Sequence, residues 1–496
     1  MEIKTNCYAA VDIGASSGRV VVGEVAEDGT IQLTEIHRFD NIQKRSDGHD
    51  CWDVDMLFRE TVAGLAKCKE AGFAPKTVGI DTWAVDFVLL DENDQVLGDA
   101  VAYRDERTNG MYAVADAIMS HDAVYRRTGI QRQPFNTIYQ LLALKREHPE
   151  QLAAAKTFLM IPDYLAFLLT GTKANEYTNA STTCLLNART QNWDESILEA
   201  FDIPRGMFCD IVMPGTDLGP VSPVIEQQIG YATHIIAPAT HDTGSAYLAV
   251  PARDADAVFL SSGTWSLLGV ENEGPITSDA SRFQNFTNEG GFELRFRFLK
   301  NIMGLWMIQS IRRERNGVSY VEGKTTHQPA EEAGLAPFKH EEKQWGFPDL
   351  IAAAKASEGF EAHVNVNDDR FLAPDSMISE IRVACFETGQ SVPETVGELM
   401  RCVYVSLSNC YAESIAEMAS LTGRTYTSIN IVGGGCQDGY LNELTTRACS
   451  IPVFAGPVEG TSLGNLAVQM LADGAFSDLQ AVRDAIATSF DVQRFE

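Results

Sequence analysis

The chain has 496 residues, of which 45% are hydrophobic and 9% aromatic, so it can bury substantial cores and a disordered chain is not expected. It carries 68 acidic residues against 39 basic ones, a formal net charge of −29. This charge argues against nucleic acid or an anionic membrane as the main partner, because both require a basic face. An anionic ligand would need backbone donors, a metal ion or local cations to bind.

No targeting segment is expected. The N-terminal stretch MEIKTNCYAAVDIG lacks the long apolar core of a signal peptide, and no run reaches the ~20 apolar residues that a membrane helix needs. Ten cysteines are scattered without a C-x-x-C pair, which is typical of reduced thiols in a cytoplasmic protein. The histidines show no metal-binding spacing, so dedicated zinc chemistry is not expected.

The first elements along the chain predict a hairpin. Two apolar runs, CYAAVDI and RVVVGEV, are joined by the small-residue turn GASSG. A third run extends the sheet, and an amphipathic helix and a further strand follow. The expected bounds are 7–13, 19–25 and 31–39 for the first three strands, 55–72 for the helix and 77–90 for the next strand.

The second half opens like the first. The stretch AVFLSSGTWSLLGV (257–270) again joins two apolar runs by a small-residue turn, and its Gly263 lies half a chain beyond Gly14. We interpret this as an internal duplication of a hairpin that opens each of two domains. The later elements are a helix over 394–423, the run SINIVGGG (428–435), a helix, a strand over 451–456 and a helix from 461 to 474.

Strands that alternate with helices predict an α/β fold with sheets covered on both faces. Proline and charged residues near 250–257 predict the domain boundary there. We therefore expect an N-terminal domain over 1–250 and a C-terminal domain over 251–496.

The familiar phosphate-binding loops are absent from the sequence. There is no Walker A motif, and GGGCQDG (433–439) has misplaced glycines for a dinucleotide fingerprint. In VDIGASSGR, by contrast, Asp12 ends a buried strand and the following turn has no bulky side chains. Backbone N–H groups there could approach a phosphate, and Asp12 is a candidate ligand for Mg²⁺, which prefers oxygen. The alternative is an ordinary hairpin turn.

Taken together, motifs in chain order resemble the FGGY carbohydrate kinases of the actin/Hsp70/hexokinase superfamily. The resemblance covers nearly the whole chain and is carried by AVDIGASSGRV, GIDTWAVDFVLLD, AYRDERTNG, QPFNTIYQL, THDTGSA, LSSGTWSLLG, NEGG, KNIMGLW, NVNDDRF, IVGGGCQ and GPVEGTSLGN. It implies an α/β fold of two ribonuclease-H-like (actin-like ATPase) domains with a cleft between them. It also implies transfer of the γ-phosphoryl group of ATP to the 1-hydroxyl of L-rhamnulose, with Mg²⁺.

The resemblance assigns site residues position by position. ATP contacts are expected at Ala15, Ser16, Ser17, Gly18, Arg19, Thr264, Asn301, Gln309 and Gly434. Sugar contacts are expected at Ala84, His241, Asp242 and Thr243. The family often has glycine where this chain has Ala84, and the extra methyl group would narrow the sugar pocket.

Asp242 is the expected catalytic base. Phosphoryl transfer needs alignment and charge stabilisation, and a carboxylate within reach of the sugar hydroxyl can accept its proton. Asp242 follows the run HIIAPA and precedes Thr243, Gly244, Ser245 and Ala246, small residues that we interpret as clearance for sugar and phosphate at a helix N-terminus. The alternative is that Asp242 only caps that helix.

Six positions also have structural interpretations. Asn301 and Gln309 lie eight apart in an expected helix and hence near one face. Arg295 and Arg297 alternate with phenylalanines, which predicts the solvent face of a strand and not a phosphate clamp. Trp83 and Phe135 are expected to form pocket wall or core.

The leading hypothesis is an ATP-dependent kinase of sugar degradation whose ketose substrate is L-rhamnulose. One alternative keeps the fold and changes the ketose, to L-fuculose or a xylulose. The other is a non-catalytic ATP-binding sensor or clamp, against which the carboxylate at 242 argues. Expected partners are a small-molecule ketose and ATP, without nucleic acid or membrane, in a cytoplasmic monomer with a dimer as the open alternative.

Overall fold

The computed structural model describes residues 3–252, 254–318, 328–339 and 343–496. Two compact units can be distinguished, each made of separate stretches of the chain. The first unit consists of Met1–Ala252, Val270–Lys300 and Glu459–Asp491, and the second of Arg253–Gly269, Asn301–Val458 and Val492–Glu496. The expected division at 250/251 remains a prediction, and residue 253 of the expected linker lies outside the described residues.

The first unit is built on a six-stranded sheet. Its strands run in the order β13 (Asp217–Pro220), β14 (His234–Ile236), β6 (Thr77–Thr82), β1 (Tyr8–Ile13), β2 (Ser17–Val25) and β3 (Ile31–Asp40). The expected hairpin is confirmed, since β1 pairs antiparallel with β2 and β2 with β3. β1, β6 and β14 are parallel neighbours, and β13 pairs antiparallel with β14.

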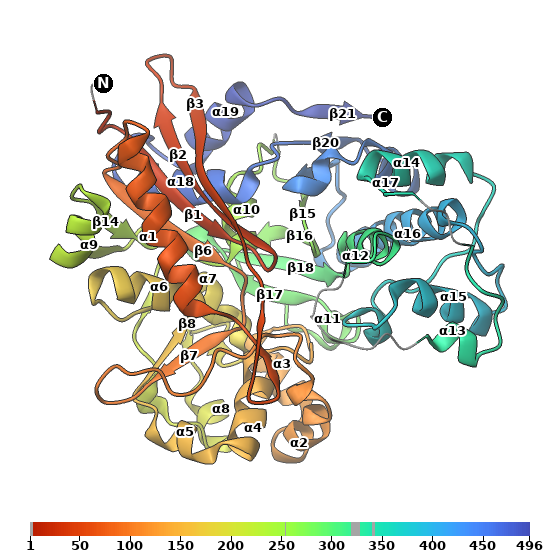
Figure 1. The fold of residues 1–496 in the computed structure, drawn as a ribbon, viewed down its shortest axis with the longest axis horizontal. Coiled ribbons are helices and arrows are strands. Elements are labelled where there is room, and N and C mark those ends of the chain that lie inside the picture. Colours follow the sequence, from red (N-terminus) through yellow and green to blue (C-terminus); the bar gives the residue numbers. More distant parts are fainter. Residues whose placement is uncertain (1–2, 253, 319–327, 340–342) are drawn as a thin grey trace. The chain divides into compact units, whose positions relative to one another are not determined.

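Helices cover both faces of this sheet. Figure 1 shows α1 (Val54–Glu70) over the strands β2 and β3, and α18 (Gly460–Ala472) on the other face, where it contacts β1 and β6. The Asp53 side chain caps α1 by accepting a hydrogen bond from the Met56 N–H, and the helix buries Leu57 and Leu65. The helix expected over 55–72 and the helix expected from 461 to 474 are therefore confirmed.

The strand expected over 77–90 is two strands. β6 ends at Thr82, and β7 (Phe87–Leu90) pairs with β8 (Thr157–Met160) in a separate two-stranded sheet. The break lies at Val85, whose φ of 66° is rare for a β-branched residue. The sequence does not reveal such a turn, because the run contains no proline and its glycine at 79 lies within β6.

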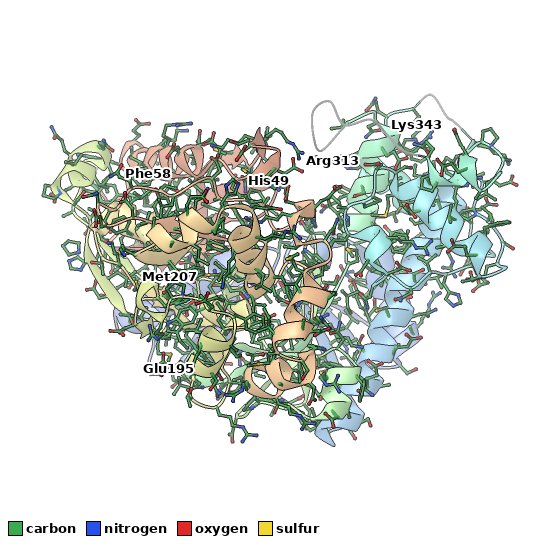
Figure 2. All side chains as sticks on the ribbon, turned by 90° about the horizontal axis from the view of Figure 1, so that it is seen from below. His49, Phe58, Glu195, Met207, Arg313 and Lys343 are labelled. Atoms are coloured by element: carbon green, nitrogen blue, oxygen red, sulfur yellow. The ribbon has the colours of Figure 1, made fainter. Side chains whose placement is uncertain are left out.

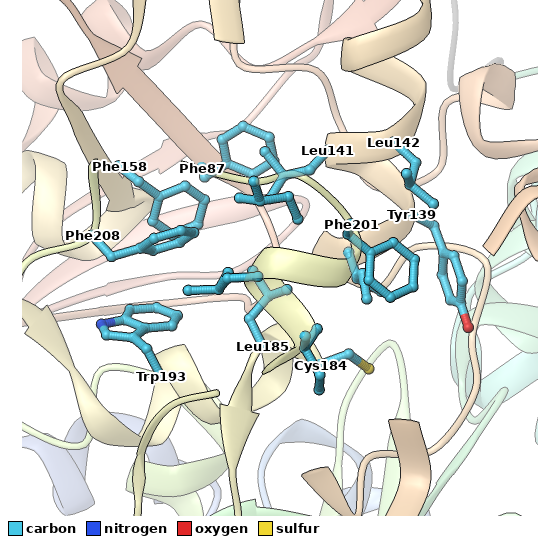
Figure 3. Close-up of a cluster of buried hydrophobic side chains, with 14 of the residues drawn as sticks. Phe87, Tyr139, Leu141, Leu142, Phe158, Cys184, Leu185, Trp193, Phe201 and Phe208 are labelled. Atoms are coloured by element: carbon cyan, nitrogen blue, oxygen red, sulfur yellow. The ribbon is translucent and has the colours of Figure 1, made fainter. Parts of the chain in front are cut away.

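β7 and β8 cover a hydrophobic core of the first unit. Figure 3 shows the aromatic rings at its centre, where the ring centroids of Phe158 lie 5.0 Å from Phe87 and 4.9 Å from Phe208. Trp193 packs on Phe208 at 4.3 Å, and its indole N–H donates to the Cys209 carbonyl oxygen. Elsewhere in the first unit, His49, labelled in Figure 2, pairs with Asp105 at 2.9 Å.

Shorter elements complete the first unit. The helices are α2 (Met111–Ile118), α3 (His121–Thr128), α4 (Thr137–Glu147), α5 (Pro149–Ala154), α6 (Ile161–Thr170), α7 (Tyr177–Ala180), α8 (Glu195–Ala200), α9 (Pro223–Ile229), α10 (Asp242–Leu248), α11 (Asp279–Phe283) and α19 (Leu479–Ser489). The strands are β4 (Lys44–Ser46), β5 (His49–Cys51), β9 (Asn175–Glu176), β10 (Leu186–Asn187), β11 (Asn192–Trp193) and β12 (Ile211–Val212).

A second sheet repeats the strand order of the first. Its order is β17 (Thr287–Gly290), β18 (Phe296–Ile302), β16 (Ser266–Asn272), β15 (Ala257–Ser262), β19 (Ser428–Val432), β20 (Val453–Ala455) and β21 (Gln493–Phe495). β15 and β16 form the second expected hairpin, β15, β19 and β20 are parallel, and β21 is antiparallel to β20. From β18 to β21 the arrangement matches that from β3 to β13, which confirms two ribonuclease-H-like sheets.

The second unit is completed by helices. α16 (Val396–Thr422) has a capping box of Thr395 and Glu398 and ends at Gly423, whose φ is 71°. Its Cys402 is fully buried, whereas Cys410 is only partly buried. The other helices are α12 (Trp306–Arg315), α13 (Pro329–Glu332), α14 (Phe347–Ala356), α15 (Met377–Glu387) and α17 (Gly439–Cys449).

Candidate active site

Three carboxylates of the first unit meet where β1, β6 and α10 come together. The parallel pairing of β1 and β6 places Asp12 opposite Asp81, and a bridge between Thr82 and His241 brings the start of α10 beside the end of β6. Asp81 is fully buried, and burial and the neighbouring charges of Asp12 and Asp242 raise its pKa well above the ordinary value. Asp12 and Asp242 were predicted from the sequence, whereas Asp81 was not.

Asp242 is the first residue of α10, and its two carboxylate oxygens differ. Oδ1 accepts hydrogen bonds from the Thr243 N–H at 2.5 Å and the Thr243 hydroxyl at 3.1 Å, and it lies 3.4 Å from His241 Nε2. Oδ2 has no hydrogen-bond partner among the described residues, and 32% of the side chain is exposed. Desolvation raises the pKa of Asp242, the Asp12 charge adds to the rise, and His241 opposes it.

The small residues after Asp242 serve helix packing and do not leave open space. Ser245 and Ala246 are fully buried. A Cβ atom placed on Gly464 of α18 would lie 1.7 Å from the Ser245 carbonyl oxygen, so α10 and α18 approach at backbone distance. The interpretation of these residues as clearance for sugar and phosphate is therefore wrong, and the close helix contact is the physical reason for their size.

The turn after β1 is held by its own backbone. The Gly14 N–H donates to the Ser17 carbonyl oxygen at 2.9 Å, and the Asn41 side chain donates to the Gly14 carbonyl oxygen at 3.0 Å. Ser16 is exposed, and Ala15 and Ser17 are half-buried. Gly18 is required because a Cβ atom there would lie 2.2 Å from the Phe39 ring. The predicted residues Ala15 to Arg19 thus form one turn and the start of β2.

Arg19 and Asp12 form an ion pair at the base of this turn. Arg19 donates to Asp12 Oδ2 through Nη2 at 2.8 Å and Nε at 3.0 Å, and it also pairs with Glu459. The Ser462 hydroxyl at the start of α18 donates to the same Oδ2 at 2.8 Å. Asp12 Oδ2 therefore has three protein donors, and Arg19 lies between two carboxylates. The metal role of Asp12 and the nucleotide role of Arg19 remain predictions.

Ala84 lies in the turn that interrupts the predicted strand. The Asp86 N–H donates to the Ala84 carbonyl oxygen at 2.9 Å, which closes a three-residue turn around Val85. Asp86 is fully buried and accepts hydrogen bonds from the Trp52 and Trp83 indoles at 2.6 and 2.9 Å. Burial raises the pKa of Asp86 to about 6, because its hydrogen bonds offset only part of the desolvation.

The expected roles of the aromatic side chains near Ala84 agree with their burial. Trp83 and Phe135 are both buried, and the rings of Trp83 and Trp52 lie 4.1 Å apart between centroids. Ala84 itself is half-buried. These rings form a rigid wall beside the turn that carries Ala84.

The nucleotide residues predicted in the second half belong to the second unit. Thr264 lies in the turn between β15 and β16, where its carbonyl oxygen accepts from the Trp306 N–H at 2.9 Å at the start of α12. Gly434 follows β19, and a Cβ atom on it would meet open space. A Cβ atom on the next residue, Gly435, would lie 1.9 Å from Ser262 Oγ, so the loop after β19 packs on the β15–β16 hairpin.

Asn301 and Gln309 do not share a helix. Asn301 lies in β18, and Gln309 lies in α12, whose first residue is Trp306. The expected common helix face is wrong, because Gly304, with a φ of 53°, turns the chain between the two elements. Both residues still lie in the second unit with Thr264 and Gly434.

The burial of Arg297 differs from the sequence-based prediction. Only 1% of its side chain is exposed, whereas the alternation around Arg295 and Arg297 predicted a solvent face for both. Arg297 pairs with Glu289 of β17 at 3.0 Å, and its Nη2 lies 3.1 Å from His241 Nδ1. Arg295 follows the expectation, with 45% of its side chain exposed.

Some features are absent from the described parts of the chain. No group of three or more His, Cys, Asp and Glu side chains that could hold a metal ion occurs within them. None of the described helices combines the length and the apolar character that a membrane span requires. All ten cysteines are among the described residues, and each is a free thiol.

Comparison with known proteins shows what the chain resembles as a whole. Residues 7–249 match the model for the FGGY family of carbohydrate kinases, N-terminal domain, and residues 258–472 match that for the C-terminal domain. A protein of Halalkalibacterium halodurans named rhamnulokinase is 49% identical over 490 residues, which cover 99% of this chain and 98% of the relative. The rhamnulokinase of Bacillus subtilis strain 168 is 41% identical, over 98% of this chain and 95% of the relative.

Solved structures share the fold at lower sequence identity. Gluconate kinase from Lactobacillus acidophilus superposes with a TM-score of 0.77 at 16% identity, over 99% of this chain and 93% of that one. Plasmodium falciparum glycerol kinase with ADP superposes with a TM-score of 0.75 at 14% identity, over 99% of this chain and 94% of that one. At these identities the structures establish the fold alone.

Proposed function

The chain belongs to the FGGY family of carbohydrate kinases, and we propose that it transfers the γ-phosphoryl group of ATP to the 1-hydroxyl of L-rhamnulose. The products are L-rhamnulose 1-phosphate and ADP. Relatives named rhamnulokinase that are 41–49% identical along nearly their whole length support this substrate. They do not favour another ketose or a non-catalytic ATP-binding sensor.

The observation that carries the proposal is the unequal surroundings of the two Asp242 oxygens. Oδ1 is held by Thr243, whereas Oδ2 has no partner among the described residues. An oriented carboxylate with one open oxygen suits a general base. Oδ2 accepts the proton of the sugar hydroxyl while the hydroxyl oxygen forms a bond to the γ-phosphorus of ATP. The bond from the γ-phosphorus to the oxygen that bridges it to the β-phosphorus breaks, which releases ADP.

The surroundings of Asp242 favour this role over that of a helix cap. A capping side chain accepts from the N–H groups two or three residues ahead, whereas the backbone N–H that Asp242 Oδ1 accepts from is that of its direct neighbour Thr243. Desolvation raises the pKa of Asp242, which makes its carboxylate a stronger proton acceptor than an exposed aspartate. Ala84, His241 and Thr243 are the proposed sugar contacts beside it.

ATP is the phosphoryl donor of a kinase of this family, and we propose which residues contact it. The proposed contacts are Ala15, Ser16, Ser17, Gly18, Arg19, Thr264, Asn301, Gln309 and Gly434. Ser16 is exposed and there is open space beside Gly434, which would let the triphosphate chain of ATP approach the protein backbone at these positions. Arg19 brings a positive charge into a chain of strongly negative net charge.

A divalent cation fits beside the turn that follows β1. The neighbouring carboxylates Asp12 and Asp81 offer only oxygen, the donor that Mg²⁺ prefers, and the buried Asp81 Oδ1 has no hydrogen-bond partner within the described parts of the chain. Because Mg²⁺ keeps several waters and binds nucleotide phosphates, a cluster of three protein ligands is not required. Asp12 would hold Mg²⁺, which supplies charge neutralisation on the phosphates when bound.

The proposal is tested by an ADP-release assay over a panel of ketoses that includes L-rhamnulose, L-fuculose and D-xylulose. We expect the highest kcat/KM with L-rhamnulose, and NMR of the product should place the phosphate on O1. A higher kcat/KM with another ketose would support the alternative substrate. ATP binding without turnover on any ketose would support a sensor and refute the kinase.

A further inference from the structure

A buried charged network lies on the side of His241 away from the reacting carboxylate. His241 is 8% exposed, and its Nε2 faces Asp242 Oδ1 at 3.4 Å. Its Nδ1 faces two groups, Arg297 Nη2 at 3.1 Å and Glu289 Oε2 at 3.3 Å. All four residues belong to the first unit, although β17 and β18 follow α10 by some 50 positions.

Arg297 is fixed by contacts other than His241. Its Nε donates to the Gly290 carbonyl oxygen at 2.9 Å, and its Nη1 lies 3.0 Å from Glu289 Oε2. With 1% and 5% of their side chains exposed, Arg297 and Glu289 form a buried ion pair. A buried guanidinium held in this way stays charged and keeps its direction.

The chemistry of the guanidinium decides which nitrogen of His241 carries the proton. Arginine nitrogens only donate hydrogen bonds, so Nδ1 must accept at the 3.1 Å contact with Arg297. An imidazole whose Nδ1 accepts carries its single proton on Nε2, the nitrogen that faces Asp242 Oδ1. The charge of Glu289, which would favour a proton on Nδ1, is compensated by Arg297, whose Nη1 lies 3.0 Å from Glu289 Oε2, although these two atoms form no hydrogen bond.

We propose that Arg297, held by Glu289, is a positioning residue that fixes the Nε2–H tautomer of His241 and so directs that proton to Asp242 Oδ1. Oδ1 then has donors from Thr243 and His241, and Oδ2 alone is left to receive the proton of the sugar hydroxyl. Arg297 acts through His241 and does not touch the substrate. This inference rests on the proposed role of Asp242 as the base.

The first test reads the tautomer directly in the unliganded wild-type protein. With ¹⁵N-labelled histidine, two-bond ¹H–¹⁵N correlations distinguish an unprotonated from a protonated ring nitrogen, and a His241→Asn variant assigns the signal among nine histidines. We expect an unprotonated Nδ1 and a protonated Nε2. A proton on Nδ1, in either the other tautomer or the imidazolium, would overturn the proposal.

The second test compares two neighbouring arginines in steady-state kinetics. Arg297→Gln frees Nδ1 to take a proton and donate it to Glu289, so kcat should fall about 10-fold while the KM for the ketose changes little. Arg297→Lys retains a charged donor and should recover part of kcat and the Nε2–H signal. Arg295→Gln is the matched control, since Arg295 is half-exposed and lies 4.0 Å from Glu271, and it should leave kcat unchanged.

The outcomes separate this proposal from the proposed function. If wild-type protein fails to phosphorylate any ketose, the function is wrong, and the spectra still report the tautomer. If Arg297→Gln folds, keeps the Nε2–H signal and loses no more kcat than Arg295→Gln, the positioning role is wrong while the kinase activity stands. Should Arg297→Gln not fold, the wild-type spectrum and Arg297→Lys still decide the matter.

Discussion

The two carboxylate oxygens of Asp242 differ in their contacts. Oδ1 is engaged by Thr243, and Oδ2 remains open among the described residues. The role of Asp242 as base was predicted from the family resemblance and stays a prediction, because the residues themselves left a helix cap as the alternative. Arg297 could not be predicted in this way, because alternation along a strand identifies two faces but not which of them another element covers.

Asp86 allows a residue-scale prediction about stability and pH. Burial raises its pKa from 3.8 to about 6 in the folded protein. A carboxyl group with a raised folded-state pKa contributes stability that is fully present below pH 3.8 and is lost as the pH rises through 6. Lowering the pH from 7 to 5 should therefore restore about 1 kcal/mol of unfolding free energy from this group.

Urea unfolding of wild type and Asp86→Asn between pH 4 and pH 7 checks this. The variant loses the hydrogen-bonding pattern around Trp52, Trp83 and Gln140, so it should be less stable throughout. The difference between the two proteins should narrow toward neutral pH, where wild type has lost the contribution of Asp86. A difference that stays constant over this range would contradict the raised pKa.

Among the elements, α18 makes hydrogen bonds to two of the three carboxylates of the candidate site. Its polar residues lie at helical spacing and bind the sheet, with Ser462 donating to Asp12, Asn465 to Asp81 and Gln469 to the Ala9 carbonyl oxygen. The helix itself was predictable from the apolar period of its sequence. Its partners were not, since 450 positions separate Ser462 from Asp12.

Gly464 of α18 tests the backbone contact between α18 and α10. A methyl group there would meet the Ser245 carbonyl oxygen at 1.7 Å, and a backbone atom cannot rotate away as a side chain can. Gly464→Ala should destabilise the protein by about 1–3 kcal/mol, and it should lower kcat because α10 carries Asp242. Thermal unfolding and turnover measure the two effects.

Gly439→Ala provides the control for that variant. Gly439 is the first residue of α17, and a methyl group there would meet only the Phe495 ring at 3.9 Å, which is ordinary contact. Gly439→Ala should therefore leave stability and turnover near the wild-type values. Equal effects of the two substitutions would show that α10 and α18 are not in backbone contact.

At the scale of the whole molecule, the duplication is the organising feature. The two hairpins with small-residue turns revealed it in the sequence, and the structure extends it to six corresponding strands in each sheet. The sequence did not predict that residues 459–491 join the first unit, because hydrophobic periodicity identifies elements but not their partners. The expected monomeric state and cytoplasmic location remain predictions.

Turnover by Asp242→Asn, with ATP and L-rhamnulose both saturating, is the most direct test of Asp242 as the catalytic base. The amide keeps the shape of the carboxylate but cannot accept the hydroxyl proton. The predicted result is a loss of about 10²- to 10⁴-fold in kcat, with ATP and ketose binding by calorimetry within a few fold of wild type. A kcat near the wild-type value with both ligands bound would contradict the assignment of Asp242 as the base.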